Sequence, residues 1–399
     1  MSGRQSAFRL PMSAVRSAAA VIALGSIVTA PALAQETVKI GLVLPLTGQL
    51  GTIGKQILWG AKLYVQQKGD TVAGKKIELI VKDDGAVPDN TKRITQEFIV
   101  NDKVNVLAGF GVTPAALAAA PLATQAKTAQ VVMGAGTSII TERSPYIVRT
   151  SFTLPQSGAT MADWAVKSGI KKVAALVSDF APGHDALASF KARFTAGGGE
   201  IIEEIKAPLS NPDFAPFLQR ARDANPDGLF IFVPSGQGGA LMKQYAERGL
   251  DKTTIKVIAT GDVTDDDQLG AMGDAVLGIV TSHHYSANHA SPTNAAYVAA
   301  FQKAYDARPN FMSVGGYDGM HLIYEALKKT GGRSDGDSLI EAMKGMSWES
   351  PRGPISIDAE TRDIIQNVYI RRVEKVNGQL HNVEFATFEA VKDPGKAKK

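Results

Sequence analysis

Val38-Lys39-Ile40-Gly41-Leu42-Val43-Leu44, ending at Pro45, is the stretch of this 399-residue sequence that decides its fold. It is a short run of residues that favour β-structure, which predicts a strand. A helical stretch follows at 57–67, and an alternating run at 76–82 predicts a second strand. Because strand, helix and strand alternate, we expect a mainly parallel sheet with helices on both faces.

The same alternation continues along the chain and begins again after about residue 150, so we expect two similar doubly wound α/β units in series. The further strands are expected at 104–110, 131–133, 172–178, 201–207, 228–233, 255–259 and 278–282. The further helices are expected at 89–100, 115–127, 184–195, 214–224, 239–248, 293–306 and 314–329. Near the end of the chain, Asn377-Gly378 separates two alternating runs and predicts a β-hairpin.

The first 34 residues have the pattern of a secretory signal peptide. Arg4, Arg9 and Arg16 form a positive start without an acid, 18–28 is apolar, and Ala32-Leu33-Ala34 is a small-x-small cleavage site. The apolar run is shorter than the roughly 20 residues of a membrane-spanning helix. We therefore expect export to the periplasm with cleavage after Ala34, and an uncleaved N-terminal anchor is the alternative.

Composition excludes several classes of protein. The sequence contains no Cys, so neither disulfides nor thiol chemistry is available to it. Its formal net charge of +4 falls to +1 once the leader with its three Arg is removed, so the charge does not indicate a nucleic-acid-binding face. The one basic cluster is at the end of the chain, at Lys392, Lys396, Lys398 and Lys399, where a frayed tail is expected.

No catalytic or metal-binding motif is complete in the sequence. A G-x-S-x-G nucleophile elbow is missing. The spacing of His283, His284 and His289 matches no metal site, and Asp265-Asp266-Asp267 lacks the calcium-loop frame and is expected to cap the helix that follows it. We therefore expect binding without a cofactor, a metal or catalysis, which argues against the rival hypothesis of an exported hydrolase.

The loops that follow the expected strands predict a binding site. In open α/β sheets, ligands bind beyond the carboxyl ends of the strands. The loops at those positions are rich in Gly, Ser, Thr or Asp, and they are 45–54, 111–114, 134–138, 178–183, 234–238 and 261–267. Two such edges facing each other would form a cleft for a small molecule.

Several motifs resemble those of periplasmic solute-binding proteins of the branched-chain amino-acid type. They are Lys39-Ile40-Gly41-Leu42-Val43-Leu44-Pro45-Leu46-Thr47-Gly48, Gly109 to Thr113, Ala120-Pro121-Leu122-Ala123, Met133-Gly134-Ala135-Gly136-Thr137 and Ser178-Asp179-Phe180-Ala181-Pro182-Gly183. The resemblance runs over nearly the whole mature chain. It implies a type I periplasmic binding fold, in which two Rossmann-like doubly wound lobes are joined by three crossovers and close around one small ligand. The expected division is 1–34 signal peptide, 36–152 plus 283–352 N-terminal lobe, 153–282 plus 353–390 C-terminal lobe, and 391–399 disordered basic tail.

The resemblance also implies where a ligand carboxylate is held. Members that bind amino acids use a hydroxyl and backbone amides from the loops that match Val112-Thr113-Pro114 and Ala135-Gly136-Thr137. Thr113 stands where a helix begins, and the positive helix end there stabilises an anion by about 0.3–2 kcal/mol. The alternative is that Thr113 and Thr137 are only helix N-caps. The candidates for the rest of the pocket are Gln49, Phe180, Ser235, Asp262, His284 and Tyr285.

The function that the resemblance implies is a monomeric receptor that delivers a small carboxylate to an inner-membrane ABC permease. Ala181-Pro182-Gly183-His184-Asp185, Arg308-Pro309-Asn310-Phe311 and Gly315-Gly316-Tyr317-Asp318-Gly319 are similar to a subgroup associated with aromatic carboxylates. The expected solute is therefore an aromatic acid or an amino acid. A receptor for branched-chain or other aliphatic amino acids and a ligand-sensing regulator of the same fold are the alternatives.

Overall fold

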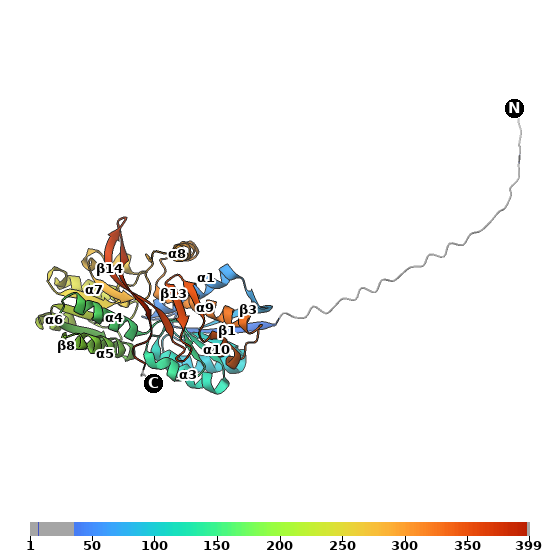
Figure 1. Ribbon diagram of the computed structural model, residues 1–399. Helices are drawn as coiled ribbons and strands as arrows, with labels where there is room; N and C mark the ends of the chain where they lie inside the picture. The colour runs from blue at the N-terminus through green and yellow to red at the C-terminus, as the bar shows by residue number, and fades with distance from the viewer. Residues whose placement is uncertain (1–6, 8–35, 397–399) are drawn as a thin grey trace, which may run out of the picture. The chain divides into compact units, whose positions relative to one another are not determined.

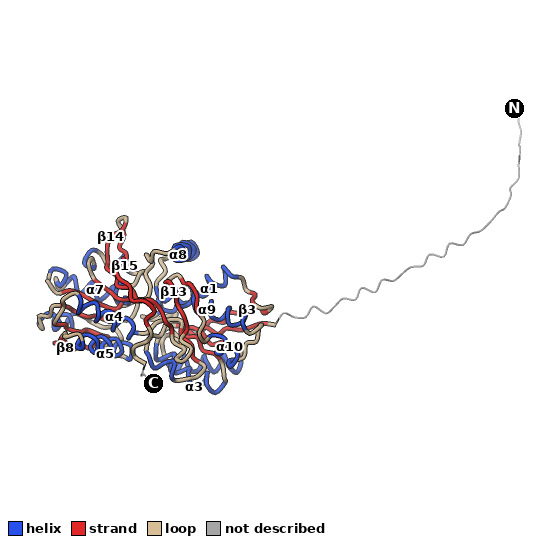
Figure 2. The backbone as a smooth tube through the Cα atoms, viewed as in Figure 1, coloured by secondary structure: helices blue, strands red, loops and turns tan. Residues whose placement is uncertain are grey.

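The computed structural model describes residue 7 and residues 36–396, so the expected leader and its cleavage site lie outside the described residues. Residues 36–396 contain a six-stranded and a nine-stranded sheet (Figures 1 and 2). We call the six-stranded sheet with its helices the first lobe, and the nine-stranded sheet with its helices the second lobe. No helix in this part of the chain is long and apolar enough to span a membrane.

The first lobe has the strand order β2-β3-β1-β4-β5-β6 and is parallel except at the edge strand β2. Its strands are β1 (Thr37–Leu44), β2 (Thr71–Val72), β3 (Lys75–Asp83), β4 (Val106–Gly109), β5 (Ala129–Val132) and β6 (Ile147–Arg149). The helices that pack on this side are α1 (Gly51–Lys68), α2 (Pro88–Glu97), α3 (Thr113–Ala126), α8 (Pro292–Tyr305), α9 (Phe311–Lys329) and α10 (Gly336–Met343).

The second lobe joins a parallel half to an antiparallel half, in the strand order β12-β13-β14-β11-β10-β9-β7-β8 with β15 beside β14. The parallel strands are β7 (Lys172–Ser178), β8 (Glu200–Ala207), β9 (Gly228–Phe232), β10 (Lys256–Thr260) and β11 (Val280–His283). The antiparallel strands are β12 (Ser347–Ser350), β13 (Gly353–Ile357), β14 (Ile364–Val376) and β15 (Gln379–Val391). The helices of this lobe are α4 (Leu154–Lys167), α5 (Ala181–Ala196), α6 (Ala215–Asp223) and α7 (Gly238–Glu247).

The chain crosses between the lobes three times: after β6, after β11 and before β12. In Figure 1 the elements β1, β3, α1, α3, α9 and α10 gather on the right, and α4, α5, α6, α7 and β8 gather on the left. This arrangement confirms the expected type I periplasmic binding fold, because each lobe is completed by a segment that returns from the other.

Helices cover both faces of each sheet, and β1 shows why. Its side chains alternate between two hydrophobic clusters: Ile40, Leu42 and Leu44 pack toward α1 and α9, while Val43 packs toward α2 and α3. Gly41 lies on the α2 side, where a Cβ would stand 2.6 Å from the ring of Phe98. From Ile40 to Leu44 the strand carries no polar side chain, because both of its faces are buried there.

Local signals predicted most of the elements. The Asn377-Gly378 hairpin is confirmed, since β14 pairs with β15 and both turn residues have positive φ, as a type I′ turn requires. The helix expected at 89–100 ends at Glu97 and continues as a π-helical turn, Phe98–Asp102. The short strands β2, β6, β12 and β13 were not predicted, because two to five residues carry too little periodicity.

The end of the chain is attached to the first lobe as far as residue 396. Asp393 accepts a hydrogen bond from Ser138, and the ammonium group of Lys396 lies 3.1 Å from Asp363 and 3.2 Å from Glu142. The side chain of Lys396 is 10% exposed. Residues 391–396, which we expected to belong to a disordered tail, are therefore held by ion pairs and hydrogen bonds, and residues 397–399 lie outside the described residues.

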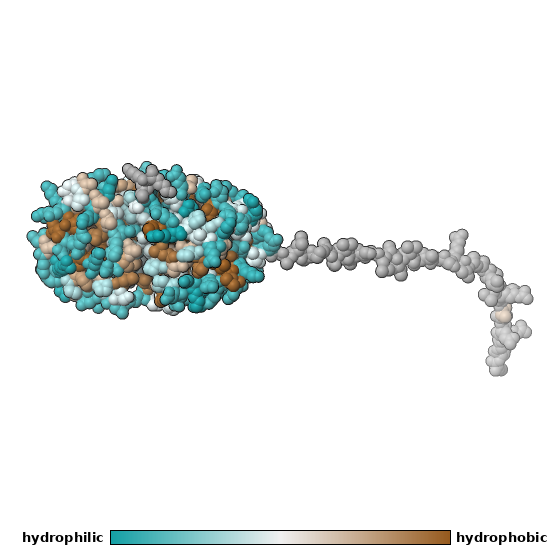
Figure 3. Space-filling view, turned by 90° about the horizontal axis from the view of Figure 1, so that it is seen from below, coloured by the Kyte–Doolittle hydropathy of each residue, from teal (hydrophilic) through white to brown (hydrophobic). Residues whose placement is uncertain are grey.

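Hydrophobic side chains are dispersed over the outer surface. On the face shown in Figure 3, brown residues are interspersed with hydrophilic ones. Among residues 36–396, the exposed large hydrophobic side chains are those of Val87, Val100, Leu277 and Phe385, which lie on different elements. The feature that points to function is therefore an internal one, between the lobes.

Candidate binding site between the lobes

A cavity of about 30 Å³ lies between the carboxyl ends of the two sets of parallel strands. It is far smaller than the range of about 300–1,000 Å³ that ligand pockets occupy, so a ligand of the size of an aromatic ring fits only when the walls move apart. Both lobes contribute to its wall, which is formed by Ile53, Gly111, Val112, Thr113, Gly134, Ala135, Gly136, Phe152, Leu154, Phe180, Pro182, Phe232, Pro234, Ser235, Asp262 and Met312. This is the place at which open α/β sheets bind ligands.

The first-lobe wall combines a hydroxyl with the start of α3. Thr113 is the first residue of α3, and its Oγ1 lies 2.8 Å from Oγ1 of Thr137. If Thr137 donates in this pair, the Thr113 hydroxyl is free to donate to a ligand. The N–H groups of Thr113 and Ala115 have no intrahelical acceptor, because they belong to the first turn. Neither Thr hydroxyl makes a capping hydrogen bond, although Thr137 stands at the N-cap position of the 3-10 helix Ser138–Glu142.

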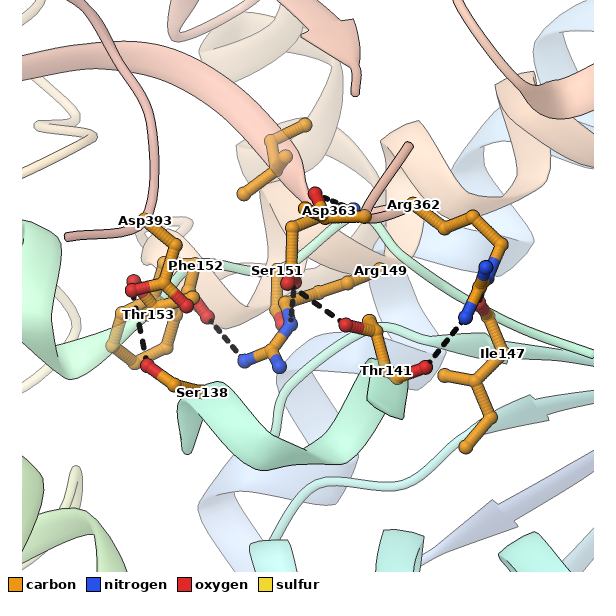
Figure 4. A network of polar contacts seen from close by, with 12 residues as sticks. Ser138, Thr141, Ile147, Arg149, Ser151, Phe152, Thr153, Arg362, Asp363 and Asp393 are labelled. Carbon is orange, nitrogen blue, oxygen red and sulfur yellow. Dashed lines mark hydrogen bonds and ion pairs between the residues drawn. The ribbon is translucent and has the colours of Figure 1, made fainter. Parts of the chain in front are cut away.

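Arg149 fixes the neighbouring backbone (Figure 4). Its guanidinium, which is fully buried, donates to the carbonyls of Ala135, Thr137 and Phe152 at 3.3, 2.7 and 3.0 Å, and Nε forms an ion pair of 2.7 Å with Asp363. A planar trans peptide directs its N–H away from its carbonyl. Since the carbonyl of Ala135 points to Arg149, we expect the N–H of Gly136 to face the cavity.

Aromatic rings form much of the remaining wall. Phe180 and Phe232 stack with their ring centroids 6.0 Å apart on the second-lobe side. Phe152, in the crossover after β6, stacks on His284 at 5.1 Å and meets Phe311 edge-to-face at 5.3 Å. Flat, apolar rings therefore line the cavity from both lobes, and such walls favour contact with a planar apolar group.

The second-lobe wall carries the polar groups Ser235 and Asp262. Ser235 donates a hydrogen bond to Asp265. Asp262 is 3% exposed, and its Oδ2 has no hydrogen-bond partner. Burial raises the pKa of Asp262 to about 7. Arg371 is fully buried and donates to the carbonyl of Gly261 at 3.3 Å, which fixes the backbone next to Asp262.

Contacts between the lobes surround the cavity. Gln49 donates to the side chain of Asn211, and the N–H of Asn211 donates back to Oε1 of Gln49 at 3.3 Å. The N–H of Ser138 donates to Asp185 of α5 at 3.0 Å. Asn310, which caps α9, donates to Asp265 at 3.1 Å. The lobes are therefore connected by hydrogen bonds that lie outside the cavity wall.

The structure brings together six of the predicted site residues, which are Thr113, Ala135, Gly136, Phe180, Ser235 and Asp262. Five others do not line the cavity. Pro114 lies in the first turn of α3, Thr137 supports Thr113, and Gln49 joins the lobes. His284 lies behind Phe152, and Tyr285 is buried with its carbonyl accepting from Arg371.

Some lining residues were not predicted from the sequence, and they are Phe152, Leu154, Phe232 and Met312. Phe152 and Leu154 follow the unpredicted strand β6, and Phe232 ends β9 itself. Had β6 been recognised, the rule that ligands bind at strand ends would have indicated Phe152 and Leu154. No sequence pattern indicated that Arg149 supports the site, because the carbonyl groups to which it donates come together only in the folded chain.

The sequence matches the family model described as periplasmic binding protein over residues 37–379. The chain belongs to the periplasmic binding protein family. A Leu/Ile/Val-binding protein homolog 6 of Brucella abortus (strain 2308) is 43% identical to this receptor over 365 residues, covering 90% of this chain and 94% of the relative. Family and fold are thus those of solute-binding receptors, as expected from the motifs.

Two solved structures of ABC-transporter solute-binding proteins are similar over almost their full length. One, from Rhodopseudomonas palustris BisB5 in complex with 3,4-dihydroxybenzoic acid, is 71% identical, with a TM-score of 0.90 over 90% of this receptor and 99% of that chain. The other, from Rhodopseudomonas palustris HaA2 in complex with p-hydroxybenzoic acid, is 44% identical, with a TM-score of 0.88 over 91% of this receptor and 100% of that chain. Both are similar to this receptor in sequence as well as in fold.

Proposed function

We propose that this protein is a receptor for one small aromatic carboxylate. The observation that carries the proposal is a cavity that is lined by Thr113 and Gly136 and by the aromatic residues Phe152, Phe180 and Phe232. Hydrogen bonds to a charged carboxylate contribute about 1.5–3 kcal/mol each, and apolar walls favour an aromatic ring. The hydroxybenzoates bound by the two similar structures support this solute class.

The proposed mechanism is binding by closure of the lobes. The solute first binds to one lobe, and the other lobe then closes over it by a hinge motion. A solute shifts this equilibrium because contacts such as those of Phe180 and Asp262 form only when the second lobe reaches it. The hydrogen bonds between Gln49 and Asn211 belong to the closed arrangement. No bond of the solute is made or broken.

The proposal includes the cellular role expected from the sequence. The leader 1–34 directs the chain to the periplasm, where the closed receptor delivers its solute to an inner-membrane ABC permease. The mature receptor works as a monomer with the lobes predicted above, 36–152 plus 283–352 and 153–282 plus 353–390, except that β12 (Ser347–Ser350) pairs in the sheet of the second lobe. Membership of the periplasmic binding protein family supports both the location and the partner.

A thermal-shift screen of the mature protein tests the solute class. Benzoate, 4-hydroxybenzoate, 3,4-dihydroxybenzoate, leucine and valine are each added over a range of concentrations. A true solute at 100 times its Kd stabilises the folded protein by about 2.7 kcal/mol. We expect the aromatic acids to raise the melting temperature. A rise with leucine and valine but with no aromatic acid would contradict the proposal.

A receptor for aliphatic amino acids is the second candidate. Its support is Asp262, since a buried carboxylate is a suitable partner for an amino-acid ammonium group. The Leu/Ile/Val-binding protein homolog of Brucella abortus adds to it. The same screen separates the two candidates.

A further inference from the structure

Asp262 is the one ionisable side chain among the residues that line the cavity. It is almost completely buried, and its Oδ2 lacks a hydrogen-bond partner. A buried polar atom left unpaired costs about 1–3 kcal/mol, so its presence needs an explanation. A donor on the solute would supply the missing partner, because this oxygen belongs to a residue of the cavity wall.

The position of Asp262 defines where that donor lies. Asp262 stands in the 3-10 turn Gly261–Thr264, directly after β10 of the second lobe. Thr113 and Gly136 belong to loops that follow strands of the first lobe. The solute carboxylate and the partner of Asp262 are therefore held by walls that belong to different lobes.

We propose that Asp262 determines specificity for ring-hydroxylated acids, by accepting a hydrogen bond from a hydroxyl at the end of the aromatic ring opposite the carboxylate. This inference rests on the proposed function. A hydroxyl at the 4-position satisfies the geometry, since it lies across the ring from the carboxylate. A hydroxyl at the 3-position lies beside it, where Ser235 offers its oxygen as an acceptor while its own proton is donated to Asp265.

Donor counting favours a hydroxyl over an ammonium group at this place. An ammonium carries three N–H donors, whereas a hydroxyl carries one. The second-lobe side chains of the wall offer two free acceptors, the unpaired Oδ2 of Asp262 and the Oγ of Ser235, because Phe180, Phe232 and Pro234 have no side-chain acceptor. The third donor of an ammonium would find no acceptor among these side chains. A buried ammonium would keep an unpaired donor there, which is costly. A phenolic hydroxyl would keep none.

The charges around Asp262 give the inference a pH signature. Burial raises the pKa of Asp262 to about 7, against the opposing effects of the Thr260 hydroxyl and of Arg371. Burial also raises the pKa of Asp265 well above its ordinary range, raises that of Asp266 and raises that of Asp267 to about 6, whereas burial lowers the pKa of His283 and keeps it neutral. Asp262 is the group of the cavity wall whose pKa lies near 7. Its ionised form accepts from a hydroxyl more strongly and repels a carboxylate that brings no hydroxyl.

Isothermal titration of benzoate and 4-hydroxybenzoate into the wild-type receptor and two Asp262 variants tests the inference. In the wild type, we expect 4-hydroxybenzoate to bind at least about tenfold more tightly than benzoate, as one charge-assisted hydrogen bond predicts. This ratio should rise as the pH increases through about 7. In Asp262→Ala it should fall to within about threefold, and in Asp262→Asn it should no longer vary with pH. Asp274→Asn, an exposed acid paired with Lys375 in the same lobe, is the control and should keep the wild-type ratio.

The outcomes are distinguishable. If Asp262→Ala weakens both acids equally, Asp262 only supports the wall and the inference is wrong. If Asp262→Ala does not fold, the pH dependence of the ratio in Asp262→Asn decides, and a dependence equal to that of the wild type overturns the inference. A wild-type protein that binds leucine but neither aromatic acid contradicts the proposed function itself.

Discussion

Replacement of Arg149 by Met should damage both stability and binding. The guanidinium is fully buried, forms the ion pair with Asp363, whose side chain is 2% exposed, and donates to three carbonyls beside the cavity. Removing one partner of a buried ion pair costs about 3–5 kcal/mol. Asp363 would keep Thr141 at 2.9 Å and Lys396 at 3.1 Å, so we expect the lower end, about 3 kcal/mol.

Urea unfolding, followed by the fluorescence of the three Trp residues, measures this loss. Arg193→Met is a matched control, because Arg193 pairs with Asp163 on the surface at 2.7 Å and should cost less than about 1 kcal/mol. Adding Asp363→Asn to Arg149→Met removes the stranded charge, so the double variant should be more stable than the sum of the single effects by at least about 0.5 kcal/mol. A loss no larger than that of the control, with additive effects of Asp363→Asn, would refute the role given to this ion pair.

Three further substitutions test the site by the affinity for 4-hydroxybenzoate. Thr113→Val keeps the shape but removes the hydroxyl, and should weaken binding roughly tenfold to a hundredfold; an unchanged Kd would remove Thr113 from the site. Gly136→Ala places a methyl about 3.2 Å from the ring of Phe152 and nearer still to Leu154, so the cavity wall must move. Binding should be lost, while circular dichroism should show that the protein still folds. An affinity equal to that of the wild type would show that the cavity accommodates the methyl group. Gln49→Ala removes the two exposed hydrogen bonds to Asn211 without touching the cavity, and stopped-flow release should be about fivefold faster, whereas an unchanged rate would show that this contact does not hold the lobes closed.

The fold could be predicted because its signals are local. The strand β1 appears in the sequence as a short run of residues that favour β-structure, and the turn between β14 and β15 appears as Asn377-Gly378. The strand-end loops followed directly, since every carboxyl end of a parallel strand marks one edge of its sheet. Two edges that face each other then place Thr113 and Asp262 in one cavity.

The parts that could not be predicted depend on contacts between distant segments. Asp265-Asp266-Asp267 was expected to cap a helix, and this prediction is wrong: Asp265 and Asp267 instead accept from Asn310, which comes from the other lobe. Arg149 ends a three-residue strand, and its partner Asp363 is more than 200 residues away in the sequence. Neither contact leaves a periodic pattern, so only the folded chain shows them.

A crystal structure of the receptor with 3,4-dihydroxybenzoate tests the central claim most directly. We predict one molecule between the lobes, with its carboxylate within hydrogen-bond distance of Oγ1 of Thr113 and the N–H of Gly136, and its hydroxyls on the side of Asp262 and Ser235. A molecule bound outside this cavity, or one whose carboxylate points toward Asp262, would contradict the account.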